Sequence, residues 1–238
     1  MMTKDEFVSK AVQIANQYKT LYVRACFGAP MTKANKAKYL TNSYNAQPSR
    51  AAKITAASSD TFGFDCSGLV KGILWGWDGK LNSTYGGAVY CDNNVPDQNA
   101  NSMIKSCKNV STDMSTVTKG ELLWKSGHIG IAISPEQCVE CTPIWNDGVQ
   151  ITRIQGRGWE KHGKYKYVDY SVELKAGDHV KITGTYYYGG TKKIPDWVKK
   201  QTWIVKSIKG DRVVIDEDVT GKYHICSAFY KSDLKIVD

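Results

Sequence analysis

The hydrophobic pattern of this chain changes from helical spacing to strand alternation about halfway along its 238 residues. Apolar residues recur at helical spacing over residues 7–18 and again over residues 69–77. From residue 121 onward they alternate with other residues over short runs that turn residues separate. Helices followed by consecutive antiparallel strands are typical of the α+β class, which we expect for the first part of the chain.

Three helices are predicted. The first follows a capping-box pattern of Thr3 and Glu6. The second starts at Asp65, buries one apolar face and is closed by Asp78-Gly79, and a third, shorter helix runs from about Asp97 into Cys107.

Two stretches predict irregular structure. Residues 22–64 are polar and punctuated by Gly, Pro and Asn, so we expect a long, partly ordered loop there. Residues 155–171 are rich in Gly, Lys and Tyr, and they place His162 in a basic loop.

Strand patterns divide the chain into two domains, residues 1–171 and residues 172–238. The second domain has short strands broken by Gly and Pro and little helical periodicity, which predicts a small all-β barrel. The predicted strands are 121–124, 128–133, 137–142 and 149–154 in the first domain, and 178–183, 202–206, 212–215 and 224–225 in the second.

Both domains are basic, with a formal charge of +6 over residues 1–171 and +3 over residues 172–238. Such a balance favours a polyanionic partner, either nucleic acid, an anionic membrane or the teichoic acid of a cell wall, and a solvated basic surface explains it equally well. Because no Lys/Arg run has the length of a nucleic-acid-binding tail, we expect no nucleic-acid partner.

The chain shows no signal-peptide pattern at its start and no apolar run of membrane-spanning length, so we expect synthesis in the cytoplasm and no stable membrane anchoring. Seven cysteines are an odd number without the close spacings of a small secreted scaffold, which predicts mostly free thiols.

Cys66 is the candidate nucleophile, because it falls at the first turn of the predicted second helix. The partial positive charge of a helix start stabilises a thiolate and can lower a cysteine pKa. An ordinary buried cysteine is the structural alternative. Ser67 and Gly68 are poor helix formers, and Gly68 lets another backbone or a substrate approach closely, which favours a working site.

His128 is the candidate general base. It begins a predicted strand, and its face also carries Gly130 and Ala132, which leave room above an imidazole. A structural role is the alternative for a lone histidine.

Glu140 is the candidate for holding that imidazole in one orientation. A loop of three or five residues around Ser134-Pro135 would place it opposite His128 on one face of the sheet, whereas a loop of two or four would separate the two faces. An exposed strand carboxylate is the other interpretation.

The pair Cys138 and Cys141 has the C-x-x-C spacing of zinc and redox sites. A single pair is weak evidence, and residues three apart on a strand point to opposite faces. We therefore expect no metal and no other cofactor.

The runs FDCSGLVK (64–71) and SGHIGIAI (126–133), with a polar residue twelve positions after the histidine, resemble the NlpC-type cell-wall cysteine peptidases. The resemblance covers roughly residues 1–170 and implies a papain-like α+β fold that cuts peptide bonds next to D-glutamate in the stem peptide of peptidoglycan. It also implies a tyrosine that positions the nucleophile and the oxyanion, for which Tyr22 matches in part. The glycine pair after the family's tyrosine is absent, and Glu140 stands where the family usually has His, Asn or Gln.

The segments GDHVKITGTYYYGG (177–190), IPDWV (194–198) and FYKSDL (229–234) resemble the bacterial SH3-like wall-binding modules of phage endolysins. The resemblance implies that peptidoglycan and wall polymers of a Gram-positive cell are the partners, and that the enzyme waits in the host cytoplasm before release. The aromatic residues suited either to carbohydrate stacking or to the barrel core are Tyr186, Tyr187, Tyr188 and Trp197.

Other functions remain open at this stage. A muramoyl-alanine amidase, or a transferase that passes the acyl group to an amine, would use the same site. A catalytically silent wall-binding or phage structural protein would keep the fold alone.

Overall fold

The computed structural model describes residues 1–171 and 174–237. The chain divides into two compact units, Met1–Tyr170 and Ser171–Asp238, each with its own hydrophobic core. Residue 172, the expected start of the second domain, lies outside the described residues. The chain combines helices with several β-sheets, as the α+β expectation requires.

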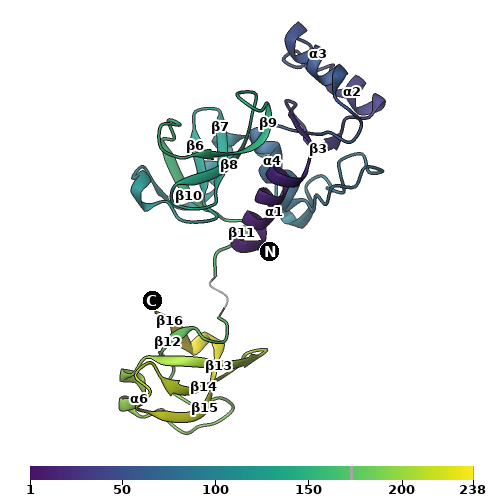
Figure 1. Ribbon diagram of the computed structural model, residues 1–238. Helices are drawn as coiled ribbons and strands as arrows, with labels where there is room; N and C mark the ends of the chain where they lie inside the picture. The colour runs from purple at the N-terminus through teal and green to yellow at the C-terminus, as the bar shows by residue number, and fades with distance from the viewer. Residues whose placement is uncertain (172–173, 238) are drawn as a thin grey trace. The chain divides into compact units, whose positions relative to one another are not determined.

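A six-stranded antiparallel sheet forms the centre of the first unit (Figure 1). Its strand order is β5-β10-β6-β7-β8-β9, so strands that follow each other along the chain from β6 to β9 are also neighbours in space. The bounds are β5 Cys107–Ser111, β6 Leu122–Lys125, β7 His128–Ala132, β8 Gln137–Thr142, β9 Gly148–Arg153 and β10 Lys161–Tyr165. A two-stranded pair of β1 (Met2–Thr3) and β11 (Val168–Asp169) lies beside it.

Helices α1 (Lys4–Gln17) and α4 (Cys66–Leu74) pack on one face of this sheet (Figure 1). The capping box predicted for Thr3 and Glu6 is present at the start of α1. Side chains from both helices and from alternate strand positions form one buried core, which includes Phe7, Ile14, Leu69, Ile73, Ile129, Ile131, Val139 and Val149. The predicted second helix therefore exists, but it ends earlier than expected.

Helix α4 ends at Leu74 rather than at Asp78-Gly79. Gly76 has φ +84°, and its N–H donates to Ile73 O while the N–H of Trp77 donates to Gly72 O. These two bonds form a Schellman motif, which only a residue tolerant of positive φ allows at this position. Trp77 leaves the helix and is buried in the same core.

The prediction of a loop over residues 22–64 is wrong. This stretch contains β3 (Phe27–Pro30), α2 (Lys33–Tyr39), α3 (Pro48–Ala56) and β4 (Phe62–Phe64), and β4 lies between β3 and β2 (Thr20–Tyr22) in a small sheet. Helices α2 and α3 extend beyond the central sheet in Figure 1. Their sequences are too polar to show an apolar stripe of ordinary width.

Long-range contacts hold α2 and α3 in place. Tyr39 and Ile54 are buried together with apolar residues of the segment that follows Tyr22. Asn45, fully buried between the two helices, donates to Arg24 O and Tyr39 O at 3.0 Å and accepts from Arg24 N. A buried amide that pairs in this way fixes a chain that has few apolar residues.

The opposite face of the central sheet carries a smaller core of Val117, Leu123, Ala132, Cys138, Ile154 and Trp159. The segment after residue 155 contributes β10, so the expected basic loop at His162 is also wrong. His162 is buried, and its Nδ1 lies 2.7 Å from Glu121 Oε2 while its Nε2 lies 3.0 Å from Asp113 O. Residues 155–171 lack a recognisable strand pattern because the buried residues of β10 are histidine, glycine and tyrosine and not aliphatic residues.

The second unit is a five-stranded antiparallel sheet of order β15-β14-β13-β12-β16. Its strands are β12 His179–Ile182, β13 Trp203–Lys209, β14 Arg212–Asp218, β15 His224–Tyr230 and β16 Leu234–Ile236. The described residues differ in two ways from the small all-β barrel expected here: no ladder joins β15 to β16, and helix α6 (Asp196–Lys200) is present. Pro195 is the N-cap residue of this helix, and Val198 within the helix is buried in the core of the unit.

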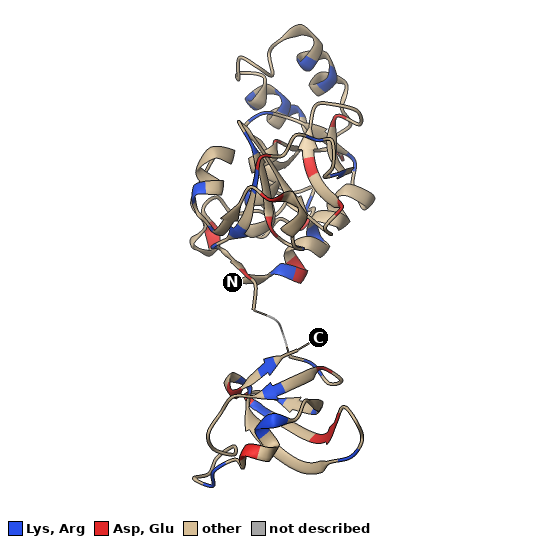
Figure 2. Cartoon of the chain, turned by 90° about the vertical axis from the view of Figure 1, so that its left-hand side faces the viewer, with Lys and Arg blue, Asp and Glu red and all other residues tan. Residues whose placement is uncertain are grey.

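Lys and Arg are spread over both units and interspersed with Asp and Glu (Figure 2). The described part of the chain contains no helix with the length and apolar character needed to cross a membrane.

Candidate active site

Cys66 is the first residue of α4, and Asp65 caps that helix. The Asp65 carboxylate accepts from the N–H of Gly68 at 2.5 Å and from the N–H of Ala25 at 2.7 Å. It therefore joins the helix start to the segment that follows Tyr22. The apolar face of α4 places the helix against the sheet. The Asp65 cap fixes the start of the helix and therefore the position of Cys66.

The structure shows which group approaches Gly68 closely. A Cβ atom at this position would lie 1.9 Å from the carbonyl oxygen of Cys26, so the close approach is to another backbone. Gly68 thus allows the Cys26 segment to pack on the first turn of α4.

The thiol of Cys66 is buried. Its Sγ lies 4.0 Å from the carbonyl oxygen of Gly127, the residue directly before His128. Burial and, second, the Asp65 carboxylate raise the pKa of the Cys66 thiol to about 12, against the opposing effect of backbone N–H groups of Ile129 and Ser67. The helix start was expected to lower this pKa, but desolvation of the charged form is the larger effect. The thiol is therefore neutral in the free protein at neutral pH.

His128 begins β7, directly after a tight turn from β6. The turn is held from α5 (Ala100–Lys105), where Asn101 Oδ1 accepts from the N–H of Gly127 at 3.0 Å and from Trp124 Nε1 at 2.9 Å. The His128 imidazole stacks on the Trp159 indole, with ring centroids 5.4 Å apart and planes 11° apart. One ring face is therefore covered, which restricts the imidazole to few orientations.

Glu140 lies on the same face of the sheet as His128. Gly130 is its direct partner across the β7–β8 ladder, so Glu140 is diagonal to His128 and not opposite it as expected. The two side chains still meet, with His128 Nε2 2.6 Å from Glu140 Oε2.

The carboxylate of Glu140 is fully buried and has three side-chain donors. Besides His128 these are Arg157, whose Nε and Nη2 donate to the two carboxylate oxygens at 2.8 Å, and Thr152, whose hydroxyl donates at 2.7 Å. Burial by itself would raise the pKa of Glu140, but the hydrogen bonds from His128, Arg157 and Thr152 outweigh it and lower the pKa to about 2. The side chain of Glu140 is thus ionised at neutral pH.

This arrangement assigns the two imidazole nitrogens. Because an ionised carboxylate only accepts, Nε2 of His128 carries a proton and donates it to Glu140. Nδ1 is then the nitrogen whose lone pair is free in the neutral ring. Such an atom can accept the proton of a thiol, which is the chemistry of a cysteine–histidine acyl-transfer site.

Tyr22 also lies near the thiol, although 44 positions separate it from Cys66 along the chain. It ends β2 and pairs with Phe64 of β4, two residues before Cys66. Burial, followed by the charges of Asp65 and Cys66, raises the pKa of Tyr22, so its hydroxyl keeps its proton. The structure thus brings Tyr22, Cys66, His128 and Glu140 into one region of the first unit.

Sequence reasoning missed four residues that support this region. Asp65 had a usable signal, since an aspartate directly before a predicted helix is a common cap. The others had none in the local sequence, because their partners are distant along the chain. These are Asn101, Arg157 and Trp159.

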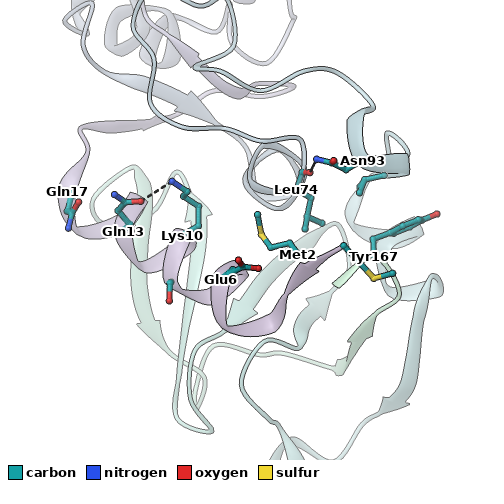
Figure 3. Close-up of a pocket in the computed structure, with 11 residues that line it drawn as sticks. Met2, Glu6, Lys10, Gln13, Gln17, Leu74, Asn93 and Tyr167 are labelled. Atoms are coloured by element: carbon teal, nitrogen blue, oxygen red, sulfur yellow. Dashed lines mark hydrogen bonds between the residues drawn. The ribbon is translucent and has the colours of Figure 1, made fainter. Parts of the chain in front are cut away.

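A cavity of about 830 Å³ runs along α1 and contains neither Cys66 nor His128 (Figure 3). One wall is polar and comes from α1, including Glu6, Lys10 and Gln13, and the other includes Leu74 and Tyr167. Glu6 is bound to the N–H and hydroxyl of Thr3, and Lys10 donates to Gln13. These polar groups therefore satisfy one another, and no reactive group faces this cavity among its lining residues.

Cys138 and Cys141 point to opposite faces of the sheet. Cys138 belongs to the small core with Trp159, and Cys141 belongs to the main core, where its thiol donates to Phe64 O at 3.2 Å. The two thiols cannot bind one metal ion from these positions.

Comparison with protein-family models and with curated proteins finds no match for this chain.

Proposed function

We propose that this chain is a cysteine hydrolase that cuts the peptide part of bacterial peptidoglycan, next to D-glutamate in the stem peptide. The observation that carries the proposal is the hydrogen-bonded series Arg157–Glu140–His128 beside the buried thiol of Cys66. Burying an ionised carboxylate costs free energy. Here that carboxylate, with a pKa of about 2, lies 2.6 Å from the imidazole of His128, which is the position of a residue that orients a base. The substrate class rests on the resemblance of residues 64–71 and 126–133 to the NlpC-type peptidases, with the papain-like fold which that resemblance implies.

In the proposed reaction the Cys66 proton passes to Nδ1 of His128 while Sγ attacks the carbonyl carbon of the scissile amide. The amine leaves with that proton, and a thioester on Cys66 remains. Water then gives a proton to the same nitrogen and attacks the thioester, which releases the acid and returns the proton to the sulfur. Tyr22 and the free N–H groups at the start of α4 are the donors available to the oxyanion.

The second unit is proposed to bind the wall without cutting it, as the SH3-like modules of phage endolysins do. Tyr186, Tyr188 and Trp197 are 43%, 38% and 47% exposed, which supports a role in contacting sugars or peptides. Tyr187 instead packs against Phe229 in the core of this unit. Together the two units support a phage or prophage endolysin, made in the host cytoplasm and acting on the wall.

One observation favours a second candidate, a catalytically silent wall-binding protein. Cys66 is 9% exposed and its thiol has a pKa of about 12, which is unlike an activated thiolate. A muramoyl-alanine amidase with the same site is distinguished from the peptidase only by the bond that it cuts.

Mass spectrometry of fragments released from purified Gram-positive walls tests the proposal. New D-glutamyl ends identify the peptidase, and a free N-terminal alanine of the stem peptide identifies the amidase. Wild-type protein should release fragments, whereas Cys66→Ser and His128→Ala should release none while keeping the far-UV and near-UV spectra of the wild type. Equal release by Cys66→Ser would refute the catalytic role of Cys66, and no release by the wild type would favour the silent protein.

A further inference from the structure

Trp145 is a strained and exposed aromatic residue close to the candidate active site. It lies in the connection between β8 and β9, its φ is +57°, and 64% of its surface is exposed. A bulky residue in the left-handed region is an outlier, and such strain concentrates at functional sites. An exposed tryptophan in a strained turn needs a reason beyond packing.

The turn that carries Trp145 is firmly held. Asp147 is buried, and both its carboxylate oxygens accept from Arg50 Nη1 of α3, at 2.7 and 2.6 Å. Ile144 O accepts from Gln150 Nε2 at 2.9 Å. The exposure of Trp145 is therefore a property of a fixed surface and not of a loose loop.

The indole also contacts the support of the candidate active site. The guanidinium carbon of Arg157 lies 4.9 Å from the indole centroid, and the same guanidinium donates twice to Glu140. One face of the indole thus rests on Arg157. Because most of the side chain is exposed, a flat apolar surface remains open to a ligand.

Polar groups surround this surface. A cavity of about 350 Å³ is lined by Trp145 and Arg157 together with Gln150, Thr152, Arg153 and Gln155. Arg153 is exposed and makes no side-chain hydrogen bond or ion pair with any residue that the structure describes. An open aromatic face, the free guanidinium of Arg153 and the carboxamide of Gln155 thus meet at one place.

We propose that this cavity binds a pyranose ring of the wall glycan, with the ring stacked on Trp145. A pyranose presents an apolar face of C–H groups and a rim of hydroxyl and acetamido groups. The indole matches the first, and Arg153 with the exposed carboxamide of Gln155 matches the second. An aliphatic ligand in the same cavity would leave the polar groups that line it without hydrogen-bond partners. The inference rests on the proposed function and specifies its substrate as a stem peptide that still carries its sugar.

The test compares two soluble substrates, a disaccharide-linked stem peptide and the same peptide without sugar. For the wild type, kcat/KM should be higher with the sugar-bearing substrate, and Trp145→Ala should lower the ratio of the two kcat/KM values about tenfold. Trp145→Phe should retain part of the ratio. Ile144→Ala is the matched control, because Ile144 is 47% exposed in the same turn and does not line the cavity, and it should keep the ratio.

The sugar-free peptide reports any effect that Trp145 has through Arg157. If Trp145→Ala lowers both values equally, Trp145 acts on Glu140 and the sugar site is refuted. If it lowers neither, the sugar site is also refuted.

A binding measurement separates this inference from the proposed reaction. The NMR resonance of the Trp145 indole N–H is assigned in Cys66→Ala protein as the one that disappears when Trp145→Phe is added. The N-acetylglucosaminyl-N-acetylmuramic acid disaccharide should shift this resonance. A shift of other indole resonances alone would overturn the assignment. This result stands whether or not the wild type cleaves either substrate.

Discussion

Arg157 donates two parallel hydrogen bonds to Glu140, from Nε to Oε1 and from Nη2 to Oε2, both at 2.8 Å. The guanidinium side chain is 13% exposed and the carboxylate is fully buried. A fork of this kind fixes the carboxylate plane, and that plane fixes the imidazole of His128. Arg157 is therefore a positioning residue for the proposed base.

Replacing Arg157 should weaken both stability and activity. Arg157→Ala leaves Glu140 buried with only His128 and Thr152 as donors, which should cost about 3 kcal/mol of unfolding free energy in urea. Arg157→Lys should cost less, because it keeps the charge but loses the fork. Activity should fall as well, because the Glu140 carboxylate no longer holds the His128 imidazole in one orientation, and kcat for muropeptide cleavage should fall by a larger factor than KM changes.

Arg153→Ala is the control for the stability measurement, because Arg153 is exposed and lies four residues away on the same segment. Its unfolding free energy should stay within about 0.5 kcal/mol of the wild type. A wild-type kcat in Arg157→Ala would contradict the positioning role.

Glu140 should matter less to turnover than His128 does, because orienting a base contributes less than being the base. Glu140→Gln should keep more activity than Glu140→Ala, since a carboxamide oxygen still accepts from Nε2 of His128. Rates of muropeptide cleavage at neutral pH measure this. Equal rates for the two variants would mean that acceptance of this hydrogen bond is not what Glu140 provides.

Glu140 also predicts a pH dependence of stability. Its pKa falls from the usual 4.5 to about 2 in the folded protein, so its stabilisation is complete above pH 4.5 and is lost as pH falls through 2. The difference corresponds to about 3 kcal/mol. Urea unfolding of the wild type between pH 5 and pH 2 should contain this loss, and Glu140→Gln should lack it. A wild-type curve parallel to that of the variant would exclude the low pKa.

The free protein should alkylate slowly at Cys66. Because the pKa of this thiol is raised to about 12 and its surface is mostly covered, iodoacetamide at pH 8 should modify the exposed Cys91 and Cys226 first. Peptide mapping by mass spectrometry gives the order. Fast modification of Cys66 at pH 6 would instead indicate a preformed thiolate, as the helix start alone suggests.

Removal of residues 172–238 should separate wall binding from cleavage. The first unit has its own core, so the truncated protein should still cut a soluble muropeptide at about the wild-type rate. Lysis of intact walls should fall strongly, because the tether that raises local concentration is gone. The isolated second unit should sediment with walls. Full lysis by the truncated protein would refute the tethering role, and loss of muropeptide cleavage would mean that the second unit contributes to the active site.

Local sequence patterns determined much of the secondary structure. The capping box of Thr3 and Glu6 marked the start of α1, and alternation marked β6 to β9 to within one or two residues. The start of α4 at Cys66 was readable too, because apolar spacing and a preceding aspartate are local signals. The same-face relation of His128 and Glu140 depended on one unknown, the length of a hairpin loop.

Only the tertiary structure decided the rest, because it depends on partners that are distant along the chain. Helices α2 and α3 each bury one large apolar residue, Tyr39 and Ile54. They are held besides by a buried asparagine and by ion pairs of Arg50 and Lys53 with Asp147. The pKa of Cys66 was predicted in the wrong direction, since a sequence shows the helix start but not the burial that outweighs it. Arg157 reaches Glu140 across 17 positions, and no periodicity encodes such a pair. Hydrogen bonds and desolvation at this range arise only when packing brings the groups together.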